Sequence, residues 1–303
     1  MKPKFINGGV KNGHDPKILD KIWSDWEKFA SYAFNKSHAT CYSWVAYQTA
    51  YLKANFPAQF MAAVMSRSLD NISDIRNLMD ECKQMGVKTL GPSVNESRHK
   101  FAVNTHGEIR FGMAAVKGVG EAAVQAIVEE RERGGLYKDL FDFFERVNLA
   151  ACNRKAIENL IIAGAFDDFK KACRETYFEP TGKQGEVYLD VLMRYGNKYL
   201  FGDQEEGFKS IHPALPKTVT TWGNLERLNK ERELVGIYLS AHPLDEYSII
   251  LDYVCNTKLT QLDGNKEELS NMDEVTIGGI VSEVRTGETK NGNPYGIVKM
   301  EDF

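Results

Sequence analysis

The sequence predicts a mainly α-helical protein of several domains, with small β-hairpins and an incomplete β-segment near its C-terminus. Apolar residues recur at helical spacing through much of the chain, beginning with Ile18, Leu19 and Ile22. Two glycines one residue apart, Gly118 and Gly120, separate two apolar segments. Alternating apolar residues after position 274 indicate strands, so the helical class carries a minor β component.

Composition describes a globular chain without a general affinity for polyanions. The 303 residues are enough for about two or three domains. The formal net charge of -4 excludes a uniformly basic surface, so any contact with nucleic acid must be a local patch. Five scattered cysteines without a Cys-x-x-Cys pair disfavour a zinc site or a disulfide framework and favour the reducing cytoplasm. No apolar run reaches membrane-spanning length, which predicts no membrane contact. With its cysteines scattered, the chain is expected to hold no metal.

Residues 15–66 are predicted to form a run of helices that starts at Asp15 and Pro16 and is interrupted at Pro57. A polar cluster of Asn35, Lys36, Ser37 and His38 lies between aromatic residues. It is either a solvated helix cap or a site at which Lys36 and His38 face the triphosphate of a nucleotide. Ser73 is the expected N-cap of a further helix, which ends before Gly86.

A short strand at 87–90 and a β-hairpin at 101–111 precede the glycine pair, with His106 expected as an exposed turn residue. The segment from Phe111 predicts a short apolar helix, a tight turn and a second helix running toward Gly134. Positive φ at Gly118 and Gly120 would let backbone N–H groups approach a phosphate, with the Lys117 charge beside them. The pattern is that of a helix-hairpin-helix motif.

Two other glycine motifs do not fit this sequence. A Walker loop needs Gly-Lys-Ser or Gly-Lys-Thr, and a dinucleotide fingerprint needs a third glycine; neither is present. A glycine corner between packed helices is the remaining alternative. A degenerate second copy follows, with a helix at 140–144, a turn at 148–152, and Asn153 capping a helix that ends at Gly164. Arg154 and Lys155 would there contact a phosphate or form a solvated basic pair.

Residues 170–222 are predicted to be a tether that contains one short helix at 187–195. Leu200 and Phe201 form an apolar patch in polar surroundings, which either folds onto the protein or inserts into a partner. Trp222 opens a further helix, and His242 is expected to be a structural residue satisfied by nearby backbone. Two strands near the end cannot bury a face alone, so the β-domain is expected to be incomplete.

Six segments together resemble the alpha subunit of bacterial DNA polymerase III, a C-family replicative polymerase. They are FNKSHA at 34–39, AYQTAYLKA at 46–54, FPAQFMAAV at 56–64, VKGVGE at 116–121, AGAFD at 163–167 and LSAHPL at 239–244. The resemblance covers nearly the whole chain in the right order. It implies a fragment with late fingers at 1–90, a β-hairpin plus tandem helix-hairpin-helix domain at 91–169, and a clamp-binding tether at 170–222. A helical connector at 223–268 and the first hairpin of a truncated OB-fold at 269–303 complete it.

The resemblance also implies roles for individual residues. Asn35, Lys36 and His38 would lie on the nucleotide-facing side of the fingers. Lys117, Gly118, Val119, Gly120, Arg154 and Lys155 would contact the backbone of duplex DNA without reading its sequence. Leu200 and Phe201 match the apolar end of the family's sliding-clamp motif, which usually has Gln where this chain has Asn197.

The same resemblance sets expectations about chemistry. The family's palm holds two Mg²⁺ ions on a carboxylate signature of the type Pro-Asp-x-Asp-x-Asp-Phe, and this chain has none. No catalytic residue and no bound cofactor are therefore expected in the fragment, which would be inactive alone although it is part of a nucleotidyltransferase. The expected partners are duplex DNA, the sliding clamp and other holoenzyme subunits. The competing hypothesis is a stand-alone helix-hairpin-helix adaptor in DNA repair without polymerase activity.

Overall fold

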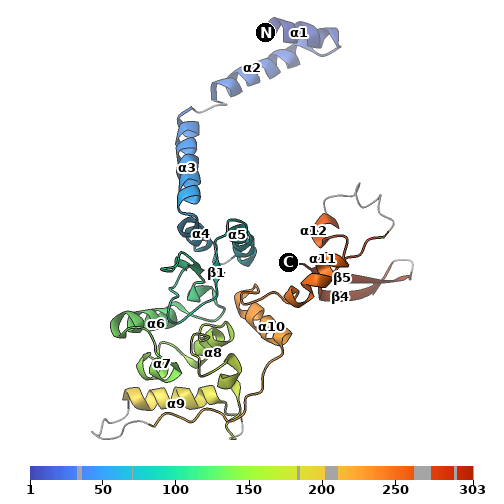
Figure 1. Cartoon of the computed structure of the whole chain (residues 1–303). Coiled ribbons are helices and arrows are strands. Elements are labelled where there is room, and N and C mark those ends of the chain that lie inside the picture. Colours follow the sequence, from blue (N-terminus) through green and yellow to red (C-terminus); the bar gives the residue numbers. More distant parts are fainter. Residues whose placement is uncertain are drawn as a thin grey trace. The chain divides into compact units, whose positions relative to one another are not determined.

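The computed structural model describes residues 1–32, 36–69, 71–182, 185–201, 211–262, 274–289 and 292–302. The chain divides into two compact units, Met1–Phe60 and Met61–Phe303. It is mainly helical, as the sequence predicts, and its described strands form one three-stranded and one two-stranded sheet (Figure 1). No helix among the described residues is long and apolar enough to cross a membrane.

The first unit consists of α1 (Lys2–Lys11), α2 (Pro16–Tyr32), α3 (Lys36–Asn55) and the start of α4 (Pro57–Met65). α2, α3 and α4 confirm the predicted run of helices, and α1 was not expected. Phe5 of α1 packs on Trp23 and Trp26 of α2, with ring centroids 5.6 and 4.9 Å apart. Leu19 is buried at the same contact. These aromatic contacts hold α1 against α2.

Helix α5 (Ile72–Gln84) begins two residues earlier than predicted. The N-cap is Asn71 and not Ser73: Asn71 has extended backbone angles, and its side chain accepts a hydrogen bond of 3.3 Å from the N–H of Asp74. Both residue types can cap a helix, so backbone geometry decides between them. Gly86 follows the helix with φ +70°, as expected of a C-terminal glycine.

Three short strands form the first sheet: β1 (Thr89–Leu90), β2 (Ala102–Val103) and β3 (Ile109–Arg110), in the order β1-β3-β2. The antiparallel pairing of β2 and β3 confirms the predicted hairpin. Its turn is closed by Asn104, whose Oδ1 accepts the N–H groups of His106 and Glu108 at 3.0 Å. The parallel pairing of β1 with β3 was not foreseen, because it joins segments about 20 residues apart.

The central body contains the 3-10 turn η1 (Met113–Ala115) and helices α6 (Glu121–Gly134), α7 (Leu140–Arg146) and α8 (Arg154–Ile162). The short helix predicted from Phe111 is thus only a three-residue turn, whereas the other three helices are confirmed. Phe143 of α7 is fully buried, and its ring lies 4.9 Å from Tyr137, 5.4 Å from Phe144 and 4.7 Å from Phe166. This aromatic cluster is the core around which the two hairpins pack.

Part of the segment predicted to be a tether, 170–222, is folded among its described residues. It contains η2 (Arg174–Phe178) and α9 (Tyr188–Phe201), which continues past the predicted end at Tyr195. α9 lies beside α7 and buries Tyr188, Leu189 and Leu192 (Figure 1). A Cβ on Gly196 would collide with the carbonyl oxygen of Phe144, so this glycine permits the close approach. α9 is longer than predicted because its apolar residues pack on a surface that local sequence does not reveal.

The remaining elements are α10 (Asn224–Val235), η3 (Asp245–Tyr247), α11 (Ser248–Tyr253), α12 (Leu259–Leu262), β4 (Ile280–Glu288) and β5 (Pro294–Glu301). β4 and β5 pair antiparallel from Ile280 opposite Glu301, which confirms the predicted hairpin. His242 accepts a hydrogen bond of 3.3 Å at Nδ1 from the N–H of Leu244, in keeping with its predicted structural role.

Candidate nucleic-acid interface

The turn at residues 116–120 joins η1 to α6 and uses its two glycines differently. Gly118 has φ +77°, as predicted, and a Cβ there would lie 2.6 Å from Nδ2 of Asn159. Gly120 has φ -79° and ψ 160°, so the expectation that it takes positive φ is wrong. No atom lies within 4 Å of a Cβ placed on Gly120. Gly118 therefore allows the left-handed backbone conformation of the turn, whereas Gly120 leaves no side chain in front of the start of α6.

The start of α6 presents free hydrogen-bond donors. Within the described part of the chain, the N–H groups of Gly118, Gly120, Glu121 and Ala122 have no acceptor, and no side chain caps the helix. The first N–H groups of a helix have no intrahelical partner, and the helix dipole places a partial positive charge there. Lys117 is exposed beside them. This end of α6 can bind a phosphate oxygen, although the exposed Glu121 carboxylate in the first turn opposes the attraction.

Two other helices hold this turn in place. The N–H of Lys117 donates to the carbonyl oxygen of Leu234 in α10 at 2.9 Å, and Nδ2 of Asn159 in α8 donates to the carbonyl oxygen of Lys117 at 2.7 Å. Asn159 is 3% exposed, and its Oδ1 is buried without a partner in the described structure. Sequence reasoning missed Asn159 and Leu234. They contact Lys117 across about 40 and about 120 residues of chain, and no local pattern indicates such contacts.

The second hairpin has the same arrangement of helix, turn and helix, but its helix cap and its basic side chains already have partners within the protein. Asn153 caps α8, and its Oδ1 accepts the N–H of Ala156 at 3.0 Å, as predicted. Arg154 forms ion pairs with Asp190 at 2.6 Å and Glu158 at 2.5 Å, and Lys155 pairs with Glu158 at 2.8 Å. The hydrogen bond to Asp190 raises the pKa of the Arg154 guanidinium. Both charges are thus compensated within the protein, unlike the free donors of the first hairpin.

The residues predicted to face a nucleotide belong to the first unit. Asn35 lies outside the described residues. Lys36 is the first residue of α3, and the structure describes its backbone only. His38 is exposed in the first turn of α3, with its ring centroid 4.3 Å from that of Tyr42. Their role in nucleotide binding stays a prediction.

The residues predicted to bind a clamp lie at the end of α9. Asn197 is exposed on this helix, and the backbone of Leu200 and Phe201 forms its last turn. A spacing of three residues places positions 197 and 200 on the same side of a helix. Positions 197 and 200 therefore share one side of α9, and clamp binding itself stays a prediction.

Metal ions in proteins are held by clusters of His, Cys, Asp or Glu side chains. Across the residues that the structure describes, no group of three or more His, Cys, Asp or Glu side chains could hold a metal ion.

Known proteins resemble both the body and the whole chain. The helix-hairpin-helix motif family matches residues 86–176. The chain is 39% identical over 301 residues to DNA polymerase III subunit alpha of Pasteurella multocida and 40% identical over 302 residues to that of Haemophilus influenzae. It is 37% identical over 301 residues to the subunit of Escherichia coli K12.

Each of these matches covers 98% of this chain and 25% of the relative, so the chain spans about a quarter of the length of the curated relatives it matches. The predicted resemblance to DNA polymerase III subunit alpha is thereby confirmed. The predicted helix-hairpin-helix motif is confirmed too, and it includes the glycine turn and both hairpins.

Proposed function

We propose that this chain is the part of a replicative DNA polymerase that holds duplex DNA by its phosphate backbone during template-directed synthesis. The uncapped start of α6, with its four free N–H groups beside Lys117, carries this proposal. Its location in a helix-hairpin-helix segment and the similarity to DNA polymerase III alpha subunits support it. Contacts to phosphates position a protein on DNA but carry no sequence information. Binding to duplex DNA is therefore independent of base sequence.

Nucleotidyl transfer belongs to the longer polymerase in this proposal. The palm carboxylates and their Mg²⁺ ions would lie outside this chain, which would be inactive alone. Asn35, Lys36 and His38 would contact the nucleotide phosphates. Association with the other holoenzyme subunits follows from the same proposal.

Duplex binding by the full chain, measured by fluorescence anisotropy across a salt series, tests the hairpin. Gly120→Val should weaken binding strongly, because the new side chain fills the open approach to the N–H groups while the backbone there suits any residue. Each phosphate contact that is lost should reduce the slope of log affinity against log salt by about 0.9. Two duplexes of unrelated sequence should bind equally.

The chain offers a matched control. Gly223 precedes α10 with φ -60° and ψ 151°, has no side-chain cap hydrogen bond, and leaves a Cβ without neighbours within 4 Å. Gly223→Val therefore changes the start of another helix in the same way and should leave duplex binding unchanged. Equal affinities for Gly120→Val and the unaltered chain would remove the hairpin from the DNA interface.

The clamp contact is a separate proposal. Leu200→Ala with Phe201→Ala should abolish capture of the chain by the cognate sliding clamp in a pull-down, since buried apolar anchors dominate such interfaces. Ile249→Ala with Ile250→Ala is the control, because it removes two neighbouring exposed apolar residues of α11. If both double variants are captured like the unaltered chain, the clamp contact lies elsewhere.

A further inference from the structure

Glu121 is the first residue of α6 and carries a negative charge at the end of the helix that is suited to anions. Its side chain is exposed, and its carboxylate forms no ion pair or hydrogen bond among the described residues. The Cα–Cβ bonds of an α-helix tilt toward its N-terminus. The carboxylate is therefore directed toward the free N–H groups of Gly118, Gly120 and Ala122 and toward Lys117. An anion bound by these donors would lie beside a negative charge of the protein.

Acidic residues in the first turns of other helices are either neutralised or belong to a capped helix. Three of them form ion pairs: Asp142 of α7 with Arg146 at 2.9 Å, Asp190 of α9 with Arg154 at 2.6 Å, and Glu226 of α10 with Lys230 at 2.9 Å. Asp74 of α5 forms no ion pair among the described residues, but the side chain of Asn71 caps that helix. Of the described α-helices, only α6 combines an unpaired first-turn carboxylate with an uncapped start.

The neighbouring charges do not neutralise Glu121. It lines a groove of about 530 Å³ together with Arg98, Lys100 and Glu129. Arg98 forms an ion pair at 3.0 Å with a carboxylate outside the groove. Lys100 and Glu129 form no ion pairs among the described residues, and their opposite charges offset one another. The charge of Glu121 therefore acts mainly against Lys117 and the helix dipole.

This near-cancellation of charge changes which anions the start of α6 prefers. Lys117 supplies one positive charge and the helix dipole about half of one, whereas Glu121 supplies one negative charge. Coulomb energy is proportional to the charge of the ligand, so without Glu121 a doubly charged phosphate would be strongly favoured over a singly charged one. A backbone phosphodiester carries one charge, whereas a phosphate monoester carries about 1.5–2 charges at pH 7. With Glu121 in place, the advantage of the monoester is largely removed.

We propose that Glu121 is a specificity-determining residue, which favours the singly charged phosphodiesters of a DNA backbone over multiply charged free phosphates at the start of α6. The inference rests on the proposed binding of duplex DNA at this helix. Nucleotidyl transfer consumes nucleoside triphosphates and releases pyrophosphate, so multiply charged phosphates surround a working polymerase. Without the Glu121 carboxylate, these phosphates would compete with duplex DNA for the free N–H groups of α6.

Glu121→Gln tests the proposal, because it removes the charge and keeps the size of the side chain. The probes are dimethyl phosphate, which carries one charge, and methyl phosphate, which carries about two at pH 8. NMR titration of the full chain at constant ionic strength, followed at the N–H signals of Gly120 and Ala122, gives a dissociation constant for each probe. A unit charge about 7 Å away in water changes the affinity for one charge about threefold and for two charges about ninefold. Glu121→Gln should therefore bind dimethyl phosphate about threefold and methyl phosphate about ninefold more tightly than the unaltered chain.

Two further variants are controls. Asp74→Asn removes an exposed first-turn carboxylate from α5 and should leave both dissociation constants unchanged. Glu121→Asp keeps the charge and should retain the selectivity of the unaltered chain. Circular dichroism should show the same helical content for all three variants, which separates a change in charge from a loss of structure.

Three outcomes would overturn the proposal: equal gains for the two probes, no response of the Glu121→Gln signals to methyl phosphate, or the same gains in Asp74→Asn. The duplex titration of Gly120→Val separates this inference from the one on which it rests. If Gly120→Val binds duplex DNA like the unaltered chain, duplex binding at α6 is wrong. If Gly120→Val binds duplex DNA weakly and Glu121→Gln gains equally for both probes, only the role of Glu121 is removed.

Discussion

Helix α3 and the helix-hairpin-helix body are both rich in aromatic residues but expose them very differently. In the body, Phe143 and Phe144 are 0% exposed and contact other rings on several sides. In α3, Trp44 is 62% exposed and Tyr47 is 64% exposed, and their main aromatic contact is with each other, at 6.3 Å. The body builds a core from its own residues, and α3 does not.

Five exposed apolar residues of α3 share one side of the helix. Trp44, Val45, Tyr47, Tyr51 and Leu52 are all exposed, and at 3.6 residues per turn they fall within roughly half of its circumference. A contiguous exposed apolar face of this kind marks a contact surface. The body therefore fills its core with its own aromatic residues, whereas α3 needs a further surface to bury its aromatic residues.

The largest expected effect contrasts one aromatic residue from each region. Phe143→Ala should lower the free energy of unfolding of the body by about 3–5 kcal/mol, because it leaves a cavity in a filled core. Trp44→Ala should change it by no more than about 0.5 kcal/mol, as exposed substitutions do. Urea unfolding followed by circular dichroism measures both. A large loss from Trp44→Ala would show that α3 has a packing partner within this chain.

A second test compares ion pairs. Glu231 is fully buried and accepts hydrogen bonds from Arg174 at 2.8 Å and from the N–H groups of Leu239 and Ser240. Glu231→Ala should destabilise the body by about 3 kcal/mol, because Arg174 stays buried with only Asp167 as its carboxylate partner. The Lys2–Asp20 pair of the first unit is exposed, so Lys2→Ala should leave the unfolding midpoint unchanged. Thermal unfolding monitored by circular dichroism distinguishes the two.

A third test concerns the support of the turn at residues 116–120. Asn159→Ala removes the donor to the Lys117 carbonyl and should cost about 1–3 kcal/mol of stability. It should also weaken duplex binding, because the turn loses one of its two tertiary supports. Asn77→Ala on the exposed side of α5 is the control and should change neither property. Undiminished duplex binding by a destabilised Asn159→Ala variant would show that the turn needs no support from α8.

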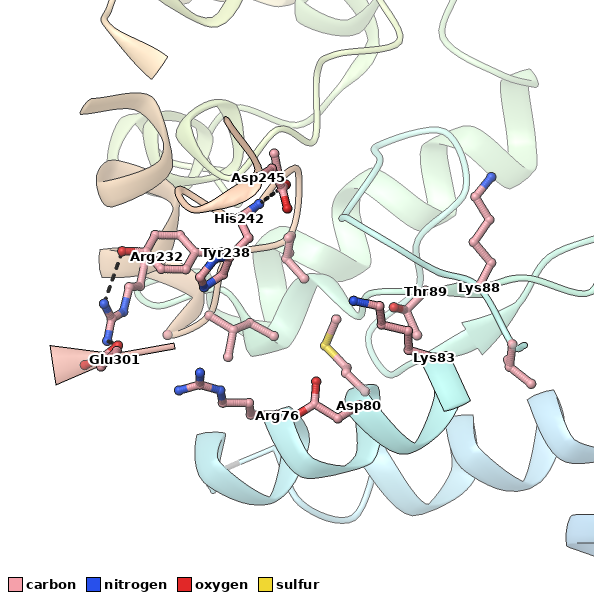
Figure 2. A pocket seen from close by; sticks show the side chains of 16 residues that line it. Arg76, Asp80, Lys83, Lys88, Thr89, Arg232, Tyr238, His242, Asp245 and Glu301 are labelled. Atoms are coloured by element: carbon pink, nitrogen blue, oxygen red, sulfur yellow. Dashed lines mark hydrogen bonds and ion pairs between the residues drawn. The ribbon is translucent and has the colours of Figure 1, made fainter. Parts of the chain in front are cut away.

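The smallest expected effect depends on pH. Burial lowers the pKa of His242 below its ordinary value of 6.5, and the nearby charges of Arg76 and Lys83 (Figure 2) lower it further against the opposing effects of Asp245 and Asp302. The unfolded chain therefore binds the proton more tightly, so this contribution to stability is present above about pH 6.5 and is lost as the pH falls through the folded pKa. Unfolding between pH 7 and pH 5 should show a shallower pH dependence for His242→Gln than for the unaltered chain.

Local sequence predicted most elements of the body because their signals are local. Asn153 caps α8 as its position indicates, and Asn104 with Gly107 closes the β2–β3 turn. The tether prediction differed because α9 is stabilised by burial against α7, which local composition does not reveal. Gly120 was misjudged because a glycine pair does not say which member needs positive φ.

The sequence by itself determined the helical class, the glycine turn, the two hairpins and the resemblance to DNA polymerase III alpha subunits. These properties follow from spacing and residue type along short stretches of chain. Only the tertiary structure decided which hairpin keeps free donors, which residues hold the turn, and which charges surround His242. Each of these joins atoms that are distant in sequence, so their approach depends on how the helices pack and not on any local pattern.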